Sequence, residues 1–535
     1  MSVADFKRVF AATGLGLAMM STAPIAALSQ TSALSRAVSV AENMQPAIPR
    51  PEQDAEVAAK LAELEARTGQ KPNILIFVVD DMGYGDPGSY GGGAAIGAAT
   101  PNMDMLAAEG LRLTSTYAQQ TCTPSRSALL TGRLPVRTGL TRPILAGDKI
   151  TANPWEGEAS VAELLSQHGY NTALVGKWHI GEVPGMRPFE VGFDEFYGFY
   201  GAQKEISQEF DERRYPDLVL DPEKLAAYHA LGGDIDLVTA RKGDTEAEVA
   251  FKTEGLEDIA EADLRLRDHT VKRIAELAAD DKPFFLYHAF MKVHTDNFPS
   301  KEFTGASASK FPYKDAMVEV DAIIGDVVEA LEATGELENT FIFVTSDNGP
   351  QMDMWPDAGY TPFRGAKGTT WEGGVRVPGI AYWKGMISPG RVSDGLFDLM
   401  DLYNTSLSLG GALGSLPTDR YLDGIDQTSF LLADNGESKR ENVYFWMGGT
   451  FAAMRMREYK AHQKVVMPAE KFLWIDMATV DGVGTAPWLF NLYIDPKEEY
   501  PVGHRMNAWL ATMGAEMKAH GATFAKYPPK KVGLE

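Results

Sequence analysis

Short apolar runs alternate along the chain with longer segments whose hydrophobic positions recur at helical spacing. Four continuous runs rich in β-branched and aromatic residues are expected to be strands buried on both faces: 73–79, 171–175, 284–290 and 340–345. Helical spacing appears at 101–110, 161–169, 256–279, 313–333 and 398–409. This order predicts an α/β fold with a large, mostly parallel sheet flanked by helices.

The pattern changes near residue 435. Short strands are expected at 443–447, 451–456 and 472–475, and a terminal helix at 506–520. These elements predict a smaller C-terminal antiparallel sheet with a helix, packed on the main domain. We therefore assign residues 71–435 to a large α/β domain and residues 436–535 to an α+β subdomain.

The first 30 residues are predicted to be an export signal. Lys7 and Arg8 precede an apolar run from Val9 to Leu28, which is long enough to span a bilayer. Glycine and proline interrupt the run and small polar residues follow it, which favours a cleaved signal over a membrane anchor. We expect residues 31–70 to form a flexible linker and a surface helix. The protein is then periplasmic or secreted, without stable membrane association after cleavage.

Composition narrows the possible partners. The chain is 44% hydrophobic and 23% charged, which is typical of a soluble globular enzyme. Its net charge of −23 repels nucleic acid, so nucleic acid is excluded as a partner, and an anionic substrate needs cations gathered at its site. The single cysteine excludes an intrachain disulfide and a cysteine-rich zinc site.

Two of the expected strands end in oxygen-bearing side chains. Asp80 and Asp81 directly follow the run 73–79, and Asp347 and Asn348 follow the run 340–345. Ligands of parallel sheets bind at the carboxyl ends of the strands, so these side chains are expected to converge. Three carboxylates and an amide oxygen favour a hard divalent cation.

The other two strands deliver cations and histidines. Lys177 and His179 follow 171–175, and in an extended chain they project from the same side. His294 follows 284–290, whereas His288 lies inside that run and is expected to be a hydrogen-bonded core histidine. Lys367 lies in a glycine-rich loop, where a lysine is more informative than on a helix face.

The only cysteine lies in Cys122-Thr-Pro-Ser-Arg-Ser-Ala-Leu-Leu-Thr-Gly-Arg133. Further motifs are Gly-Lys-Trp-His at 176–179, the run Phe-Arg-Gly-Ala-Lys-Gly-Thr-Thr-Trp-Glu-Gly-Gly-Val-Arg-Val-Pro at 363–378, and Trp-Leu-Phe-Asn-Leu-Tyr-Ile-Asp-Pro at 488–496. With these motifs in this order, the chain resembles the type I, formylglycine-dependent sulfatase family. Its arylsulfatase-like members belong to the alkaline phosphatase superfamily. The resemblance spans roughly residues 72–500.

The resemblance implies that a formylglycine-generating enzyme oxidises Cys122, and that formylglycine then carries a covalent sulfate intermediate. The implied reaction is hydrolysis of an aryl or carbohydrate sulfate monoester, assisted by one Ca²⁺ ion. Arg126 is implied to hold the modified residue, His179 to act as base, and His294 as acid to the leaving alcohol. Lys177 and Lys367 are implied to bind the sulfate. The implied metal ligands are Asp80, Asp81, Cys122, Asp347 and Asn348.

Two alternatives stay open. A phosphomonoester or phosphonate hydrolase of the same superfamily uses a similar pocket, and an unmodified Cys122 is compatible with a non-catalytic protein that binds sulfated glycans. One family position departs from the pattern: the serine that often helps to bind sulfate is not found among Tyr200, Gly201 and Ala202. The polar segment from Lys204 to Thr253 is expected to be a solvated inserted loop near the substrate entrance.

Overall fold

The computed structural model describes residues 34–532 except 146–147, 202–207, 231–235, 468–478 and 485. The predicted export signal at 1–30 and the expected strand at 472–475 lie outside the described residues.

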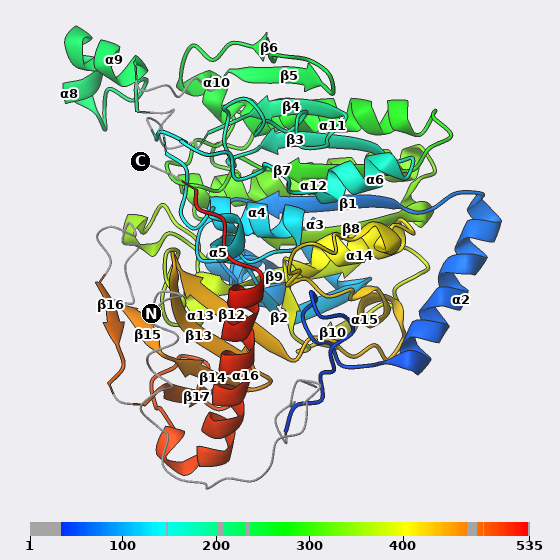
Figure 1. The fold of residues 1–535 in the computed structure, drawn as a ribbon. Coiled ribbons are helices and arrows are strands. Elements are labelled where there is room, and N and C mark those ends of the chain that lie inside the picture. Colours follow the sequence, from blue (N-terminus) through cyan, green and yellow to red (C-terminus); the bar gives the residue numbers. More distant parts are fainter. Residues whose placement is uncertain are drawn as a thin grey trace, which may run out of the picture.

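A large mixed sheet forms the centre of the molecule (Figure 1). Its strand order is β10-β2-β9-β8-β1-β7-β3-β4-β5-β6, and β11 also pairs with β2. The strands from β8 to β4 in this order run parallel, while β9, β5 and β6 pair antiparallel with their neighbours. The strands are β1 (Asn73–Val79), β2 (Leu111–Tyr117), β3 (Asn171–Lys177), β4 (Glu195–Phe199), β5 (Leu237–Arg241), β6 (Glu248–Phe251), β7 (Phe284–Ala289), β8 (Thr340–Ser346), β9 (Arg376–Tyr382), β10 (Arg391–Ser393) and β11 (Phe397–Asp398).

Helices cover both faces of this sheet, which confirms the predicted α/β class. The helices of the main domain and its N-terminal approach are α2 (Pro51–Thr68), α3 (Pro101–Ala108), α4 (Cys122–Thr131), α5 (Pro135–Thr138), α6 (Val161–Gln167), α8 (Pro216–Val219), α9 (Pro222–His229), α10 (Leu256–Ala260), α11 (Ala262–Leu277), α12 (Pro312–Ala333), α13 (Glu372–Val375), α14 (Asp401–Leu409) and α15 (Thr428–Leu432).

The alternation of side chains along β1 explains the two helical layers. Ile74 and Ile76 pack in one core with residues of α4, α6 and α14. Leu75 and Phe77 point to the opposite face and pack with α3, α11 and α12. Because consecutive strand residues point to opposite faces, a strand with six consecutive buried apolar residues after Asn73 needs a helical layer on each side.

The C-terminal subdomain has the predicted antiparallel sheet and helix. A sheet of order β12-β13-β14-β17 lies beside a two-stranded pair, β15 and β16. Met513 and Phe524 of the terminal helix share a core with Trp446, Phe451 and Met454 of the sheet. Figure 1 shows this helix beside the small sheet. The elements are β12 (Asn442–Met447), β13 (Thr450–Met456), β14 (Tyr459–His462), β15 (Lys464–Met467), β16 (Thr479–Gly482), β17 (Trp488–Asn491) and α16 (Asn507–Lys526).

Two expectations about polar segments were wrong. Within Lys204–Thr253, β5 pairs with β4 and β6 pairs with β5, so this segment extends the main sheet instead of forming a solvated loop. Residues 34–50, expected to be a flexible linker, lie against the protein. Val38 pairs with Ala47, and Glu441 accepts hydrogen bonds from Ser35 and from the backbone N–H of Ala37. Backbone pairing is available to polar sequences, and apolar periodicity does not report it.

Candidate active site

The predicted site residues meet at one edge of the main sheet. The parallel strands β8, β1, β7 and β3 are consecutive neighbours, so their carboxyl ends lie side by side. Asp347 follows β8, Asp80 follows β1, His294 follows β7, and Lys177 ends β3. Four segments far apart in sequence thereby deliver charged side chains to one place.

Cys122 is the first residue of α4 and is buried against the acids of β1. Its thiol lies 3.4 Å from Asp80 Oδ1 and 3.9 Å from Asp81 Oδ1. Burial and the nearby Asp347 carboxylate raise the pKa of the Cys122 thiol well above its usual value. The unmodified cysteine is therefore a neutral thiol at neutral pH, which makes it a poor nucleophile as it stands.

The rest of α4 holds this cysteine in place. All ten residues of the helix are buried. Its first turn is fixed by the backbone N–H of Gln119, which donates to Ser125 Oγ at 2.9 Å. Gly132 ends the helix with a φ of 67°, and a Cβ atom there would lie 2.6 Å from the ring of Tyr403. The glycine of the cysteine motif is thus required by the packing of the helix end.

The acidic cluster, which consists of Asp80, Asp81 and Asp347 with the amide of Asn348, has the chemistry of a cation site. One ligand atom each from Asp80, Asp81, Cys122 and Asp347 lies within 4.8 Å of the others. Asn348 Nδ2 donates to Asp81 at 2.6 Å, whereas its Oδ1 is buried without a hydrogen-bond partner among the described residues. An uncommitted oxygen beside three buried carboxylates fits a hard divalent cation.

Three cationic side chains face the acidic cluster. Arg126 donates from Nε and Nη2 to Asp347 Oδ2 at 2.9 and 2.7 Å. Lys367 Nζ lies 2.8 Å from Asp81 Oδ2, and Lys177 is paired with Asp80. All of these side chains are almost fully buried. Buried carboxylates this close together need such compensation, and the same lysines are placed to meet an incoming anion.

Both predicted active-site histidines are neutral. His179 Nε2 lies 2.9 Å from the carbonyl oxygen of Ile144, which requires the proton on Nε2. Its Nδ1 is buried without a partner among the described residues and is thus a bare acceptor. His294 Nδ1 lies 2.5 Å from the carbonyl of Thr295, and its Nε2 is 3.7 Å from Asp81. Burial, with Lys177 beside His179 and Lys367 beside His294, lowers both pKa values well below normal.

The loop that carries Lys367 is fixed by its own backbone. The N–H of Lys367 donates to Pro350 O at 3.0 Å, and the N–H of Gly368 donates to Gln120 O at 2.7 Å. The second bond ties this loop directly to the segment before Cys122. The positions of Lys367 and Cys122 are therefore coupled through one hydrogen bond.

A second set of buried charges joins this loop to the C-terminal subdomain. We call Glu372, Lys460, His462 and Glu498 the charged bridge. Lys460 Nζ lies 2.9 Å from Glu372 and 3.3 Å from Glu498, and His462 Nε2 lies 2.6 Å from Glu498. Glu498 also accepts from the backbone N–H of Glu372 at 2.7 Å. The small sheet thus anchors the end of the Lys367 loop.

Several supporting residues were not assigned a role from the sequence. Asp86 accepts from the N–H of Gly83 and from Tyr313 OH, both at 2.7 Å, and so fixes the loop after Asp80 and Asp81. In the sequence, the repeated aspartate between Asp80 and Asp86 was the signal that could have indicated this role of Asp86. No sequence signal could have indicated the charged bridge, because its members lie as far as 126 positions apart in sequence.

His288, by contrast, takes no part in the site. It is fully buried in β7, its Nδ1 lies 2.8 Å from Thr270 Oγ1, and its ring lies 4.6 Å from that of Phe290. The backbone carbonyl of Tyr200, in the stretch where the family serine is missing, accepts from the N–H of His179 at 2.8 Å. That stretch therefore contributes backbone contacts to the site.

The fold and this donor set define the chain as a hydrolase of the sulfatase class, and comparison with known proteins agrees. The sulfatase family model matches residues 72–412. N-acetylgalactosamine-6-sulfatase of Canis lupus familiaris is 34% identical over 82% of this chain and 83% of its own length. Arylsulfatase A of Homo sapiens is 36% identical over 80% of this chain and 83% of its own length. The chain belongs to the type I sulfatase family, and the enzyme is a sulfuric ester hydrolase.

Solved structures extend this comparison. The PsFucS1 sulfatase from Pseudoalteromonas sp. is 54% identical with a TM-score of 0.91, and the match covers 94% of this chain and 100% of that one. Ps i-CgsB in complex with k-i-k-neocarrahexaose is 26% identical with a TM-score of 0.66, and the match covers 85% of this chain and 93% of that one.

Among the described residues, no helix is long and apolar enough to cross a membrane.

Proposed function

We propose that this sulfatase acts through formylglycine derived from Cys122 and through one Ca²⁺ ion bound by Asp80, Asp81, Asp347, Asn348 and the modified residue. The observation that carries the proposal is the convergence of Cys122, the acidic cluster and three cations at one edge of the sheet. The cation supplies Lewis-acid stabilisation of sulfate oxygens. Formylglycine supplies the nucleophile and carries the sulfate covalently until it is released.

The side chains of the chain itself divide the remaining work. Lys177 and Lys367 bind the sulfate oxygens as point charges, and Arg126 keeps Asp347 and the first turn of α4 in register. The bare Nδ1 of His179 accepts the proton from the modified residue. His294 becomes a competent acid once the negative substrate lies beside it, because a nearby anion raises the pKa of an imidazole.

We further propose a carbohydrate sulfate as the substrate. Two buried acceptor atoms have no hydrogen-bond partner among the described residues: Asn297 Oδ1 and Asp357 Oδ1. Both side chains contact the loop that carries His294, since Asn297 donates to Val293 O and Asp357 accepts from Thr295 Oγ1, each at 3.2 Å. Asp357 Oδ2 accepts from the N–H of Asn297 at 3.0 Å, so the two side chains form one unit. Buried acceptors of this kind need donors, and sugar hydroxyls provide them where an aryl ring does not. The name of the N-acetylgalactosamine-6-sulfatase and the glycan complex of Ps i-CgsB support the same substrate class.

The segment around Arg214 contributes to the part of the site that receives the alcohol portion of the substrate. Arg214 pairs with Asp296 at 2.8 Å, two residues beyond His294, and Tyr215 OH donates to the same carboxylate at 3.1 Å. The inserted segment therefore contacts the loop that carries His294. We infer that it shapes the part of the site that receives the sugar.

Purified protein co-produced with a formylglycine-generating enzyme tests the proposal. Mass spectrometry across Cys122 should show the aldehyde, and a panel of sulfated sugars and aryl sulfates should show sulfate release. The Cys122→Ala variant should keep the fold by circular dichroism and lose turnover. Normal turnover in that variant, or no aldehyde in an active wild type, would overturn the mechanism. Fully unmodified and inactive protein that binds sulfated glycans would favour the non-catalytic alternative.

The phosphate alternative is tested on the same preparation. A phosphonate monoester hydrolase of Agrobacterium radiobacter shares the fold at 18% identity and a TM-score of 0.53, so the fold alone does not separate the two activities. We expect kcat/KM for an aryl sulfate to exceed that for the matching aryl phosphate and phosphonate. The reverse order would assign the chain to phosphoester chemistry.

We also propose that the first 30 residues direct export to the periplasm or the medium. Fractionation of producing cells followed by N-terminal sequencing should find mature protein outside the cytoplasm and lacking this segment. A full-length cytoplasmic protein would contradict the proposal.

A further inference from the structure

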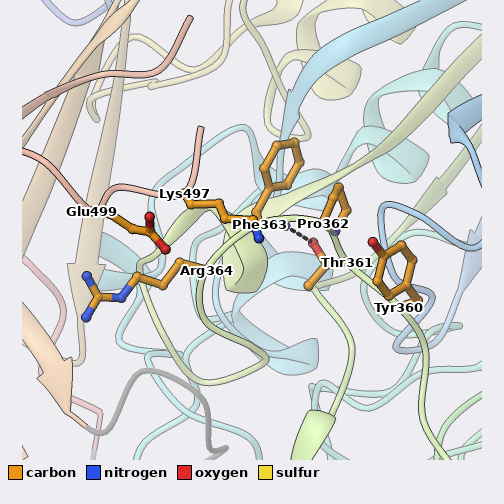
Figure 2. A pocket seen from close by; sticks show the side chains of 7 residues that line it. All are labelled: Tyr360, Thr361, Pro362, Phe363, Arg364, Lys497 and Glu499. Atoms are coloured by element: carbon orange, nitrogen blue, oxygen red, sulfur yellow. Dashed lines mark hydrogen bonds between the residues drawn. The ribbon is translucent and has the colours of Figure 1, made fainter. Parts of the chain in front are cut away.

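A cavity of about 520 Å³ lies where the main domain meets the C-terminal subdomain. We call it the interdomain cavity. Its volume is within the range of small-ligand sites. Figure 2 shows its lining, with Tyr360 at one end of the view and Arg364 and Glu499 at the other. The lining residues are Tyr360, Thr361, Pro362, Phe363 and Arg364 from the main domain, and Lys497 and Glu499 from the segment after β17.

Two short connections link the lining of the interdomain cavity to residues of the catalytic centre. Arg364 lies three residues before Lys367, so at most about 11 Å of extended chain separates them. Lys367 itself reaches Asp81 at 2.8 Å. At the other end, the carbonyl oxygen of Tyr360 accepts from the N–H of Gly85 at 2.8 Å, four residues beyond Asp81. A ligand that continues one or two sugar rings from the catalytic centre can reach this cavity.

The lining combines cations, an acceptor and an aromatic ring. Arg364 is held in place, because Nη1 donates to Glu498 O at 3.0 Å and the guanidinium lies 4.1 Å from the Trp371 ring centre. Lys497 is exposed and forms no ion pair with any described residue. Glu499 is exposed and offers a hydroxyl acceptor, and Tyr360 leaves 38% of its surface open. The lining carries two cations, Arg364 and Lys497, and one acid, Glu499. This is a local excess of positive charge in a chain whose net charge is −23.

We propose that the interdomain cavity binds a second anionic sugar unit of an oligomeric or polymeric sulfated glycan whose neighbouring unit occupies the catalytic centre. Arg364 and Lys497 bind its sulfate group, Glu499 accepts its hydroxyls, and the Tyr360 ring packs against the sugar face. This inference rests on the proposed function for the chemistry at Cys122. It adds that the substrate is a chain of sugars and that the C-terminal subdomain selects it.

The test measures how two inhibitors reduce turnover of 4-nitrophenyl sulfate by the modified enzyme. Low-molecular-mass dextran sulfate, a sulfated glucan, spans both sites, whereas inorganic sulfate fits the catalytic centre alone. In Lys497→Glu we expect the inhibition constant for dextran sulfate to rise about fivefold, since exposed charge pairs contribute up to about 1 kcal/mol and the reversal adds repulsion. The constant for inorganic sulfate should stay the same. Lys497→Arg should behave as wild type.

Lys518→Glu is the matched control, because Lys518 is an exposed lysine on α16 of the same subdomain. An equal loss of dextran sulfate inhibition in both variants, or no loss in Lys497→Glu, overturns the proposal. Absence of sulfate release by wild type from both the aryl sulfates and the sulfated sugars refutes the proposed function instead. Calorimetric binding of dextran sulfate to wild type, Lys497→Glu and Lys518→Glu then still decides whether the cavity binds it.

Discussion

Lys460 is the central cation of the charged bridge, and its removal measures how firmly the C-terminal subdomain holds the Lys367 loop. Its Nζ lies 2.9 Å from Glu372 and 3.3 Å from Glu498, and all three side chains are fully buried. Burial alone raises the pKa of Glu372, but Lys460, Arg376 and Arg455 lower it to about 2. Lys460→Met keeps most of the side-chain length and removes the charge.

The expected cost follows from what the substitution leaves behind. Two buried carboxylates lose their shared partner, and breaking a buried pair in this way typically costs 3–5 kcal/mol. Part of the compensation survives, because Arg376 lies 3.3 Å from Glu372 and His462 lies 2.6 Å from Glu498. We therefore expect a loss of about 3 kcal/mol in the free energy of unfolding.

Urea unfolding followed by tryptophan fluorescence measures this loss. The control is Lys384→Met: Lys384 pairs with Glu332 at 3.1 Å, but the side chains are 43% and 65% exposed, so we expect a change within about 0.5 kcal/mol. The double variant Lys460→Met/Glu498→Gln should be less destabilised than the sum of its two single variants. Inorganic sulfate should inhibit Lys460→Met more weakly, because the Lys367 loop loses its anchor. Equal stability of Lys460→Met and Lys384→Met would refute the reasoning.

Three further predictions concern pH and the cation. Burial and His269 lower the pKa of His288 to about 3, so the unfolded chain takes up a proton here at a higher pH than the folded state does. The free energy of unfolding therefore falls by about 1.4 kcal/mol per pH unit below pH 6.5. Unfolding of His288→Gln, measured as a function of pH, should lack this contribution. Burial raises the pKa of Asp398 to about 7, so the folded state binds a proton here more tightly than the unfolded chain does. The stability that this proton contributes is fully present below pH 3.8 and is lost as the pH rises to 7. Asp398→Asn should therefore be stabilised at pH 8, by up to about 4 kcal/mol, and an unchanged melting temperature would contradict this. EDTA should abolish turnover and lower the melting temperature, and added Ca²⁺ should restore both; full activity after exhaustive chelation would exclude the cation.

Much of the fold was accessible from local pattern. The run 73–79 is apolar at every position after Asn73, which indicates burial on both faces, and β1 is buried throughout. The two antiparallel strands beyond β4, β5 and β6, were not accessible in this way. The strands β5 and β6 carry polar and exposed residues, and their hydrogen bonds come from the backbone, which has no side-chain signature.

Several of the residues that meet at one edge of the main sheet were also accessible, because Asp80, Asp347 and Lys177 lie at the ends of strands that the sequence sets. Their mutual geometry was not. The 4.8 Å grouping of Asp80, Asp81, Cys122 and Asp347 exists because β8 and β1 are neighbours in the sheet and α4 packs against the same core. The neutral state of His179 likewise depends on burial and on the nearby Lys177, and the carbonyl of Ile144 decides which ring nitrogen carries the proton.

The sequence by itself determined the class of this protein, since the cysteine motif, the strand-end acids and the glycine-rich lysine loop are local patterns of residues. Only the tertiary structure decided how the C-terminal subdomain enters the site. The pairs Glu372–Glu498 and Arg364–Glu498 join segments more than 100 residues apart. Such contacts form only once the two sheets have packed, because the burial that makes them strong does not exist in any single segment.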